Sequence, residues 1–254
     1  MNNNLKPRLQ YMLNTYMLLI LILMWGLVIC GSSWGFWSHP CDEAGKLLTD
    51  STQGISDDLA EKIIAKCPDG ATGHLAKGFQ FERQGSASKA ITEYQRSIDL
   101  DPTLGHAHGR LGLLHLKRDS DIVAAAELTK AITLTPDSSY HRGLAMLLHK
   151  EGETVLLIFH AIEALKSKPG DLELRIWLAD AYKKHGEYHR AKEEYAKVLA
   201  LEPSNVHAHL GLAETHKIKG NLDDAIREFS DASLSDPSNK LIHRELAELY
   251  QKKG

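Results

Sequence analysis

The chain contains 254 residues, of which 43% are hydrophobic and 25% are charged, and its formal net charge is −3 at pH 7. This apolar content suffices for a packed core and excludes a disordered chain. Acidic and basic residues are interleaved without a basic stripe, so nucleic acid is not an expected partner.

The first predicted element is an apolar helix from Tyr11 to Trp34, which contains the run YMLLILILMWGLVIC. At about 1.5 Å per residue, such a helix would span roughly 35 Å, enough to cross the hydrocarbon core of a membrane. Lys6 and Arg8 precede the segment, whereas acidic residues follow it at positions 42 and 43. Because positive charge favours the cytoplasmic side, we expect the chain after Trp37 to lie outside the cytoplasm.

Three fates are open to this segment: a retained anchor, a cleaved signal peptide or a lipoprotein signal. Small residues at Gly31 and Ser33 form only a weak cleavage pattern, and the apolar core is long for a signal peptide. The stretch before Cys30 resembles a lipobox, but Ile29 is not the small residue that this motif requires. We therefore expect residues 1–37 to be a cytoplasmic tip and a single-pass transmembrane anchor in the inner membrane of a bacterium.

Six prolines mark a regular period in the rest of the chain. Successive members are 34, 34, 33, 34 and 34 residues apart, and the six are Pro68, Pro102, Pro136, Pro169, Pro203 and Pro237. Most of them follow a stretch that reads as a helix, such as AKEEYAKVLALEP. A fixed period of this length predicts stacked helical repeats.

Small and large residues also recur at fixed positions when the proline is counted as residue 32 of each unit. Position 8 holds Gly78, Gly112, Ala145, Ala179, Ala213 and Ala247; position 20 holds Ala90, Ala124, Leu157, Ala191 and Ala225; position 24 holds Tyr94, Leu128, Ala161, Tyr195 and Phe229. Two helices approach closely only where side chains are small, so these columns predict a tight helix pair in each unit. Position 15 is glycine in four units and Asp119 in another, which predicts a turn with positive φ.

This pattern resembles the tetratricopeptide repeat, most closely in LELRIWLADAYKKHGEYHRAKEEYAKVLALEPSN at residues 172–205. The resemblance implies an all-α fold, a right-handed α-solenoid of helix pairs with a concave inner face, preceded by the transmembrane helix. It departs from the family in the irregular unit that holds Leu157. The implied units are a degenerate first repeat at 38–70, five repeats at 71–104, 105–137, 138–171, 172–205 and 206–239, and a C-terminal capping helix at 240–254.

Seven of the fourteen histidines lie in two of the repeat columns. Position 4 and position 11 are packing positions in the family, and they hold His74, His108, His141, His209 and His243, and His115 and His216, respectively. His106 and His108 would point to nearly opposite sides of a helix, unlike paired metal ligands. We therefore expect no metal site.

Enzyme signatures are absent from the sequence. It contains no haem-binding C-x-x-C-H, no Gly-rich phosphate loop, no G-x-S-x-G and no H-E-x-x-H. With nearly every residue after Cys41 assigned to repeats, we expect no catalytic residues, no cofactor and no small-molecule substrate.

Cys41 and Cys67 flank the degenerate first repeat, at the start of its expected first helix and the end of its second. These ends are neighbours in an antiparallel pair, so outside the cytoplasm a disulfide would staple this terminal repeat. Two buried thiols are the alternative.

The functional surface implied by the resemblance is the inner groove, lined by positions 2, 5, 9 and 12. The protein-binding residues expected there are Leu75, Phe79, Leu113, Leu116, Met146, Asp180, Lys183, Glu214 and Lys217. Phe79, Leu113, Leu116 and Met146 are predicted to form one exposed apolar strip that receives a peptide or helix, with the later charges setting its direction. Packing within the array, or a segment of this chain, could instead cover the strip.

The sequence thus predicts a non-enzymatic, membrane-anchored adaptor or scaffold that holds a protein partner in the periplasm during assembly, maturation or secretion. A stable accessory subunit of a membrane complex and a regulatory arm of a separately encoded enzyme are the alternatives.

Overall fold

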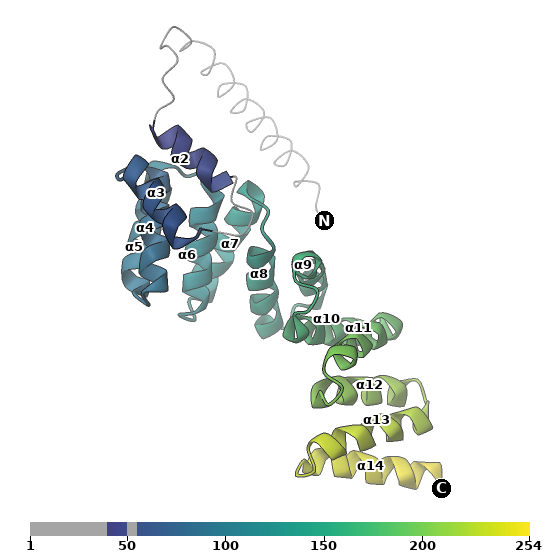
Figure 1. The fold of residues 1–254 in the computed structure, drawn as a ribbon. Coiled ribbons are helices and arrows are strands. Elements are labelled where there is room, and N and C mark those ends of the chain that lie inside the picture. The colour runs from purple at the N-terminus through teal and green to yellow at the C-terminus, as the bar shows by residue number, and fades with distance from the viewer. Residues whose placement is uncertain (1–39, 50–54) are drawn as a thin grey trace, which may run out of the picture. The chain divides into compact units, whose positions relative to one another are not determined.

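The computed structural model describes residues 40–49 and 55–254, and residues 40–254 form one compact unit (Figure 1). Every regular element in the described residues is an α-helix. No helix among them is long and apolar enough to cross a membrane, and the expected anchor at 1–37 lies outside the described residues. The helices are α2 (Pro40–Thr49), α3 (Asp57–Lys66), α4 (Ala71–Arg83), α5 (Ala87–Leu100), α6 (Gly105–Leu116), α7 (Asp121–Leu134), α8 (Ser138–Glu151), α9 (Thr154–Ser167), α10 (Leu172–Lys184), α11 (Tyr188–Leu201), α12 (Val206–Ile218), α13 (Leu222–Ser235) and α14 (Lys240–Lys253).

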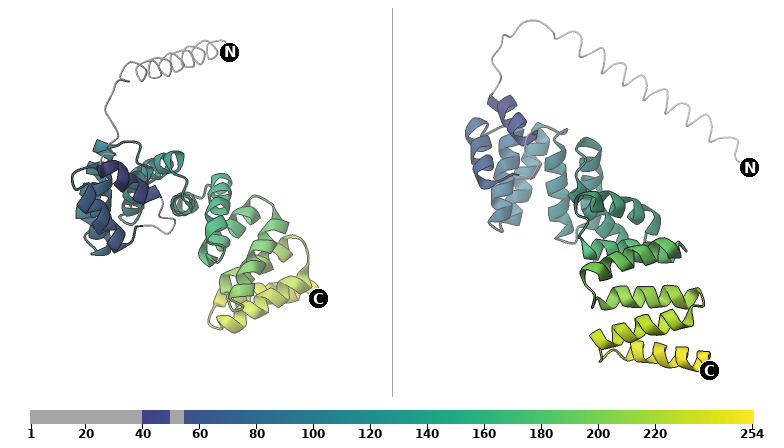
Figure 2. Two further views of the ribbon diagram at one scale, coloured as in Figure 1. Left: turned by 45° about the horizontal axis from the view of Figure 1, so that its top comes forward. Right: turned by 45° about the vertical axis from the view of Figure 1, so that its right-hand side comes forward.

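These helices pack in consecutive pairs, and the pairs stack in chain order (Figures 1 and 2). The closest contacts join α4 with α5, α6 with α7, α8 with α9, α10 with α11, and α12 with α13. The first helix of each pair also packs on the second helix of the pair before it, and α14 packs on α13. The described residues therefore form an all-α solenoid, in which each pair buries its apolar face only against its neighbours.

Local sequence signals set the limits of the helices. The Asp171 side chain accepts a hydrogen bond from the Leu174 N–H at 3.1 Å, and Asn205 does the same for the Ala208 N–H at 3.0 Å. These caps satisfy backbone donors that have no partner inside the helix. At the turns, Gly152 has φ +76°, and Asp119 has φ +53°, the one positive φ of a non-glycine in the described residues. The positive φ expected at position 15 is confirmed at both residues.

Small residues bring the helices together, as their columns predict. A Cβ on Gly78 would lie 2.4 Å from the Tyr94 ring of the paired helix. In the unit where position 8 is Ala179, the large residue Tyr195 instead leans on the next unit, and a Cβ on Gly211 would lie 2.2 Å from its Cζ. A glycine on one helix thus provides the space that each of these two rings occupies.

The irregular unit keeps its packing by exchanging sizes between two columns. Its position 20 holds Leu157 where the other units have alanine, and its position 24 holds Ala161 where most have a large side chain. Both side chains are buried in one cluster with Ala145. The exchange moves apolar volume by one helical turn along α9 without removing it from the core.

Position-4 histidines in four units, among them His108 and His209, link the two helices of the unit through a residue 19 places later. His108 Nδ1 lies 2.6 Å from a Glu127 carboxylate oxygen, while its Nε2 lies 3.0 Å from the Pro102 carbonyl oxygen. His209 makes the same two contacts with Glu228 and Pro203, each at 2.9 Å. The prediction that these residues pack between helices is incomplete, because they also hydrogen-bond the partner helix and the preceding loop.

Candidate protein-binding groove

Three hollows lie along the first helices of the repeats. One, of about 260 Å³, lies between α6 and α8; another, of about 160 Å³, between α8 and α10; and a third, of about 500 Å³, between α12 and α14. Each is lined by apolar groups together with charged side chains from neighbouring units. We name this series of hollows the groove.

The first hollow has an apolar floor and a cationic rim. Leu113 and Met146 line it with the backbone of Gly143, while Arg110 and Arg142 stand at its edge. A Cβ at Gly143 would lie 3.1 Å from a Leu113 methyl and would narrow the hollow. The glycine therefore keeps the hollow open on the side of α6. The hollow could hold one apolar side chain of a bound segment.

A buried carboxylate fixes the arginine at this rim. Glu82 lies 2.5 Å from an Arg110 Nη2 and accepts a hydrogen bond from the Tyr94 hydroxyl at 3.0 Å. Burial acts to raise the pKa of Glu82, but the bonds to Arg110 and Tyr94 outweigh it, so its pKa lies below the ordinary value. Burial, helped by the Glu82 charge, raises the pKa of Tyr94. Arg110 is consequently held in place over the Phe79 ring, 4.6 Å from its centroid.

The prediction of one exposed apolar strip is wrong. Leu116, one of its four members, is 8% exposed and belongs to the core. Leu75, which was expected in the groove but not in the strip, is 0% exposed and also belongs to the core. Phe79 is half-buried beneath Arg110 and beside Tyr94, and Leu113 and Met146 are half-buried. These side chains are covered because the first helices of neighbouring units approach closely at their glycines. For example, the Tyr140 ring occupies the space that a Cβ at Gly109 would fill.

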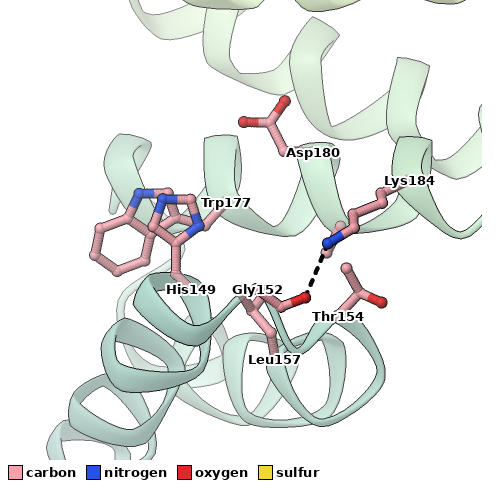
Figure 3. A pocket seen from close by; sticks show the side chains of 8 residues that line it. His149, Gly152, Thr154, Leu157, Trp177, Asp180 and Lys184 are labelled. Atoms are coloured by element: carbon pink, nitrogen blue, oxygen red, sulfur yellow. Dashed lines mark hydrogen bonds between the residues drawn. The ribbon is translucent and has the colours of Figure 1, made fainter. Parts of the chain in front are cut away.

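The second hollow is framed by an aromatic stack (Figure 3). The His149 and Trp177 rings are nearly parallel, with centroids 4.9 Å apart, and Arg142 Cζ lies 5.6 Å from the centroid of the Trp177 ring. Across the hollow, Lys184 Nζ donates to the Gly152 carbonyl at 3.0 Å. Trp177 was not among the predicted groove residues. A signal was present, since position 6 is small in most of the other units and tryptophan here.

Paired charges occupy the later part of the groove. Lys183 contacts Glu214 at 2.5 Å, and Lys217 contacts Glu245 at 2.5 Å, so each pair joins consecutive units. The structure thus brings the predicted residues Lys183, Glu214 and Lys217 to this face. Because these charges are already paired within the chain, they would contribute less to orienting a ligand.

Asp180, the fourth predicted charge, is the centre of a network between α10 and α12. It accepts hydrogen bonds from the Tyr195 hydroxyl and from His207 Nε2, the latter at 2.8 Å. Burial acts to raise the pKa of Asp180, but these bonds prevail and its pKa is lowered. The bond to Asp180 raises the pKa of His207, so this histidine retains its positive charge to higher pH.

Cys41 and Cys67 form a disulfide at the N-terminal end of the array, with their Cα atoms 4.9 Å apart. The bond joins the start of α2 to the residue that follows α3.

Among the described residues, one cluster has the spacing of metal ligands, namely His209, Glu228 and Asp231. Both ring nitrogens of His209 already make the hydrogen bonds that those of His108 make in its own unit. We therefore interpret this cluster as a link between two helices.

Comparisons with known proteins agree with this geometry. Residues 183–249 match the tetratricopeptide repeat family model. The tetratricopeptide repeat protein YrrB, described as having an unusual peptide-binding site, shares 17% identity, with a TM-score of 0.66 over 75% of this chain and 98% of YrrB. A MamA structure shares 19% identity, with a TM-score of 0.60 over 70% of this chain and 96% of MamA. A tetratricopeptide repeat protein from Parabacteroides merdae shares 21% identity, with a TM-score of 0.55 over 71% of this chain and 72% of that one.

The described chain is therefore an α-solenoid of the tetratricopeptide type. At these identities the structural likeness shows the fold, and the family match supports the resemblance seen in the repeat columns. No curated protein matches the sequence significantly.

Proposed function

We propose that this protein is a non-enzymatic scaffold that binds an extended segment of a protein partner in the groove. The observation that carries the proposal is the series of hollows between successive first helices, each with apolar walls and a charged rim. Tetratricopeptide solenoids are interaction modules, which agrees with binding in these hollows.

The chemistry of the groove favours a particular kind of segment. An aliphatic side chain would fill the hollow between Leu113 and Met146. A carboxylate beside it would share Arg142, which is one-third exposed, with the partners that this residue already has, Asp171 and Glu173. Farther along, the His149 and Trp177 stack offers a flat apolar surface to a second side chain. We therefore expect a peptide with two apolar anchors and an acidic residue near the first.

We further propose that residues 1–37 anchor this scaffold in the inner membrane and that the repeats lie in the periplasm. The basic residues before the apolar segment and the acidic residues after it support this topology. The Cys41–Cys67 bond also suits an oxidising compartment. In this setting, the scaffold would hold its partner during assembly, maturation or secretion at the membrane.

The experiment is quantitative capture of the partner by the full chain, extracted from its own membrane in mild detergent. Met146→Glu places a charge in the first hollow, and we expect it to reduce capture at least tenfold. Thr92→Glu adds the same charge on the exposed side of α5 and is the matched control. Equal capture by a folded Met146→Glu variant and the control would overturn groove binding.

A further inference from the structure

Two histidines meet between the paired helices α8 and α9. His141 lies on α8 and His160 on α9, and their Nδ1 atoms are 2.9 Å apart. His141 is 9% exposed and His160 is half-buried, while the Phe159 ring contacts both in edge-to-face geometry. Only one of the two facing nitrogens can carry the shared proton, so the other presents a lone pair.

The other repeats show that this histidine pair is a departure. Position 23 holds a glutamate whose carboxylate contacts the position-4 side chain in the other four repeats; these glutamates are Glu93, Glu127, Glu194 and Glu228. A link between the two helices therefore does not require the second histidine, His160. The carboxylate of unit 138–171 lies three residues later instead, at position 26, where Glu163 replaces the basic residues Arg96, Lys130 and Lys197 of three other units.

Positions 4, 23 and 26 can bring three ligand atoms together, as the last repeat shows. There they hold His209, Glu228 and Asp231, whose ligand atoms all lie within 4.8 Å of one another. In unit 138–171 the same positions hold the histidine pair and Glu163. The one-residue shortening of the proline period falls before α8, so the spacing of the three positions is unchanged. Glutamate is also one methylene longer than aspartate, which gives Glu163 the greater reach.

Glu163 bonds Lys166 in the structure, at 2.6 and 2.8 Å, so it must turn to join the pair. The Lys166 side chain is 65% exposed, and exposed ion pairs of this kind contribute little to stability. Burial lowers the pKa of both histidines, although the nearby Glu163 charge acts to raise them. The rings are consequently neutral at pH 7, the form that coordinates metals.

Two imidazoles and one carboxylate are a favourable ligand set for Zn²⁺. In tetrahedral coordination the two nitrogens would stand about 3.3 Å apart, so a small rotation of the rings would admit the ion. We propose that His141, His160 and Glu163 bind one Zn²⁺ ion, with water in the fourth position. None of the three lines a hollow of the groove, so this site goes beyond the proposed function. The expectation of no metal site considered histidines along one helix and not a pair across two.

The first test is calorimetric titration of the full chain with Zn²⁺ at pH 7, in detergent micelles, with no histidine tag and with Cys30 replaced by serine. One ion per chain should bind. His160→Gln should weaken binding at least tenfold, because it removes a nitrogen ligand while its amide oxygen can still accept from His141. His209→Gln is the matched control at position 4 of the last repeat and should leave the affinity unchanged. No bound zinc, equal affinity in His160→Gln, or a loss in His209→Gln alone would overturn the site.

The second test shows whether Glu163 coordinates the ion. Lys166→Ala releases the carboxylate, so zinc should bind roughly two- to fivefold more tightly, and the same substitution should gain less in a Glu163→Gln background. X-ray absorption of the zinc-loaded chain should show two imidazole nitrogens at about 2.0–2.1 Å, and one in His160→Gln. Unchanged affinity in Lys166→Ala, or a spectrum without two imidazole ligands, would contradict the proposal.

Discussion

Gly211 lies where the packing of two repeats meets the charged network of the groove. Its absent Cβ would lie 2.2 Å from Cζ of Tyr195, which is 0% exposed and whose hydroxyl donates to Asp180. In Gly211→Ala, the ring must move and the bond to Asp180 must lengthen or break. Overpacking of this kind costs about 1–3 kcal/mol, whereas alanine gains up to about 1 kcal/mol over glycine inside a helix.

The expected net loss is therefore about 1–2 kcal/mol, equivalent to a fall in Tm of roughly 3–6 °C for a chain of this size. Circular dichroism during thermal and urea unfolding of the full chain would measure it. Gly45→Ala is the control, because a Cβ there meets nothing within 4 Å and should be neutral or slightly stabilising.

A second background isolates the cause. Tyr195→Leu introduces the residue that Leu128 provides at the same position of another unit. In that background, Gly211→Ala should lose most of its cost, since the smaller side chain can yield. The reasoning is refuted if Gly211→Ala is as harmless as Gly45→Ala, or if its cost is the same with leucine present.

Three further predictions concern the turn, the groove network and the disulfide. Asp119 has positive φ, so Asp119→Gly should be at least as stable as the natural chain, whereas Asp119→Ala should lose roughly 1 kcal/mol in urea unfolding; the opposite order would contradict this. The bond to Asp180 raises the pKa of His207, so the stabilisation that this bond gives the fold is complete below pH 6.5 and is lost as the pH rises through the folded pKa. His207→Ala should therefore lower the free energy of unfolding more at pH 6 than at pH 9, and equal losses would exclude this linkage. Reducing Cys41–Cys67 should destabilise α2 and α3 by about 3 kcal/mol in hydrogen exchange, and two free thiols in protein from its native membrane would disprove the bond.

The sequence was most informative where a single physical requirement recurs in every unit. The proline period and the columns of small residues predicted helix pairs, because close approach requires a small side chain wherever a ring such as Tyr94 is buried. Even the exception at Leu157 and Ala161 follows, since the two positions exchange volume. Asp119 was correctly placed in a glycine-type turn for the same reason.

Exposure was harder to predict, because it depends on the distance between units. Leu116 occupies a nominal groove position but is buried, since the glycines of α6 and α8 bring these helices close together. The histidine links between residues 19 apart depend on helix rotation, which a column of histidines does not reveal. The exposed apolar side chains of α9 were visible in the sequence, but only by comparing positions 18, 19, 22 and 25 between units, where Phe159 replaces polar residues such as Thr92 and Glu193.

The central claim, that a partner lies in the groove, is tested most directly by site-specific photo-cross-linking in intact membranes. A photoreactive residue would replace Lys117 or Lys184, exposed residues that line the first and second hollows, or Thr92 on the outer side of α5. The account predicts that one partner is captured from Lys117 and Lys184 but not from Thr92, and that Met146→Glu abolishes the Lys117 adduct. Capture of the partner from Thr92, with no adduct at either groove position, would contradict it.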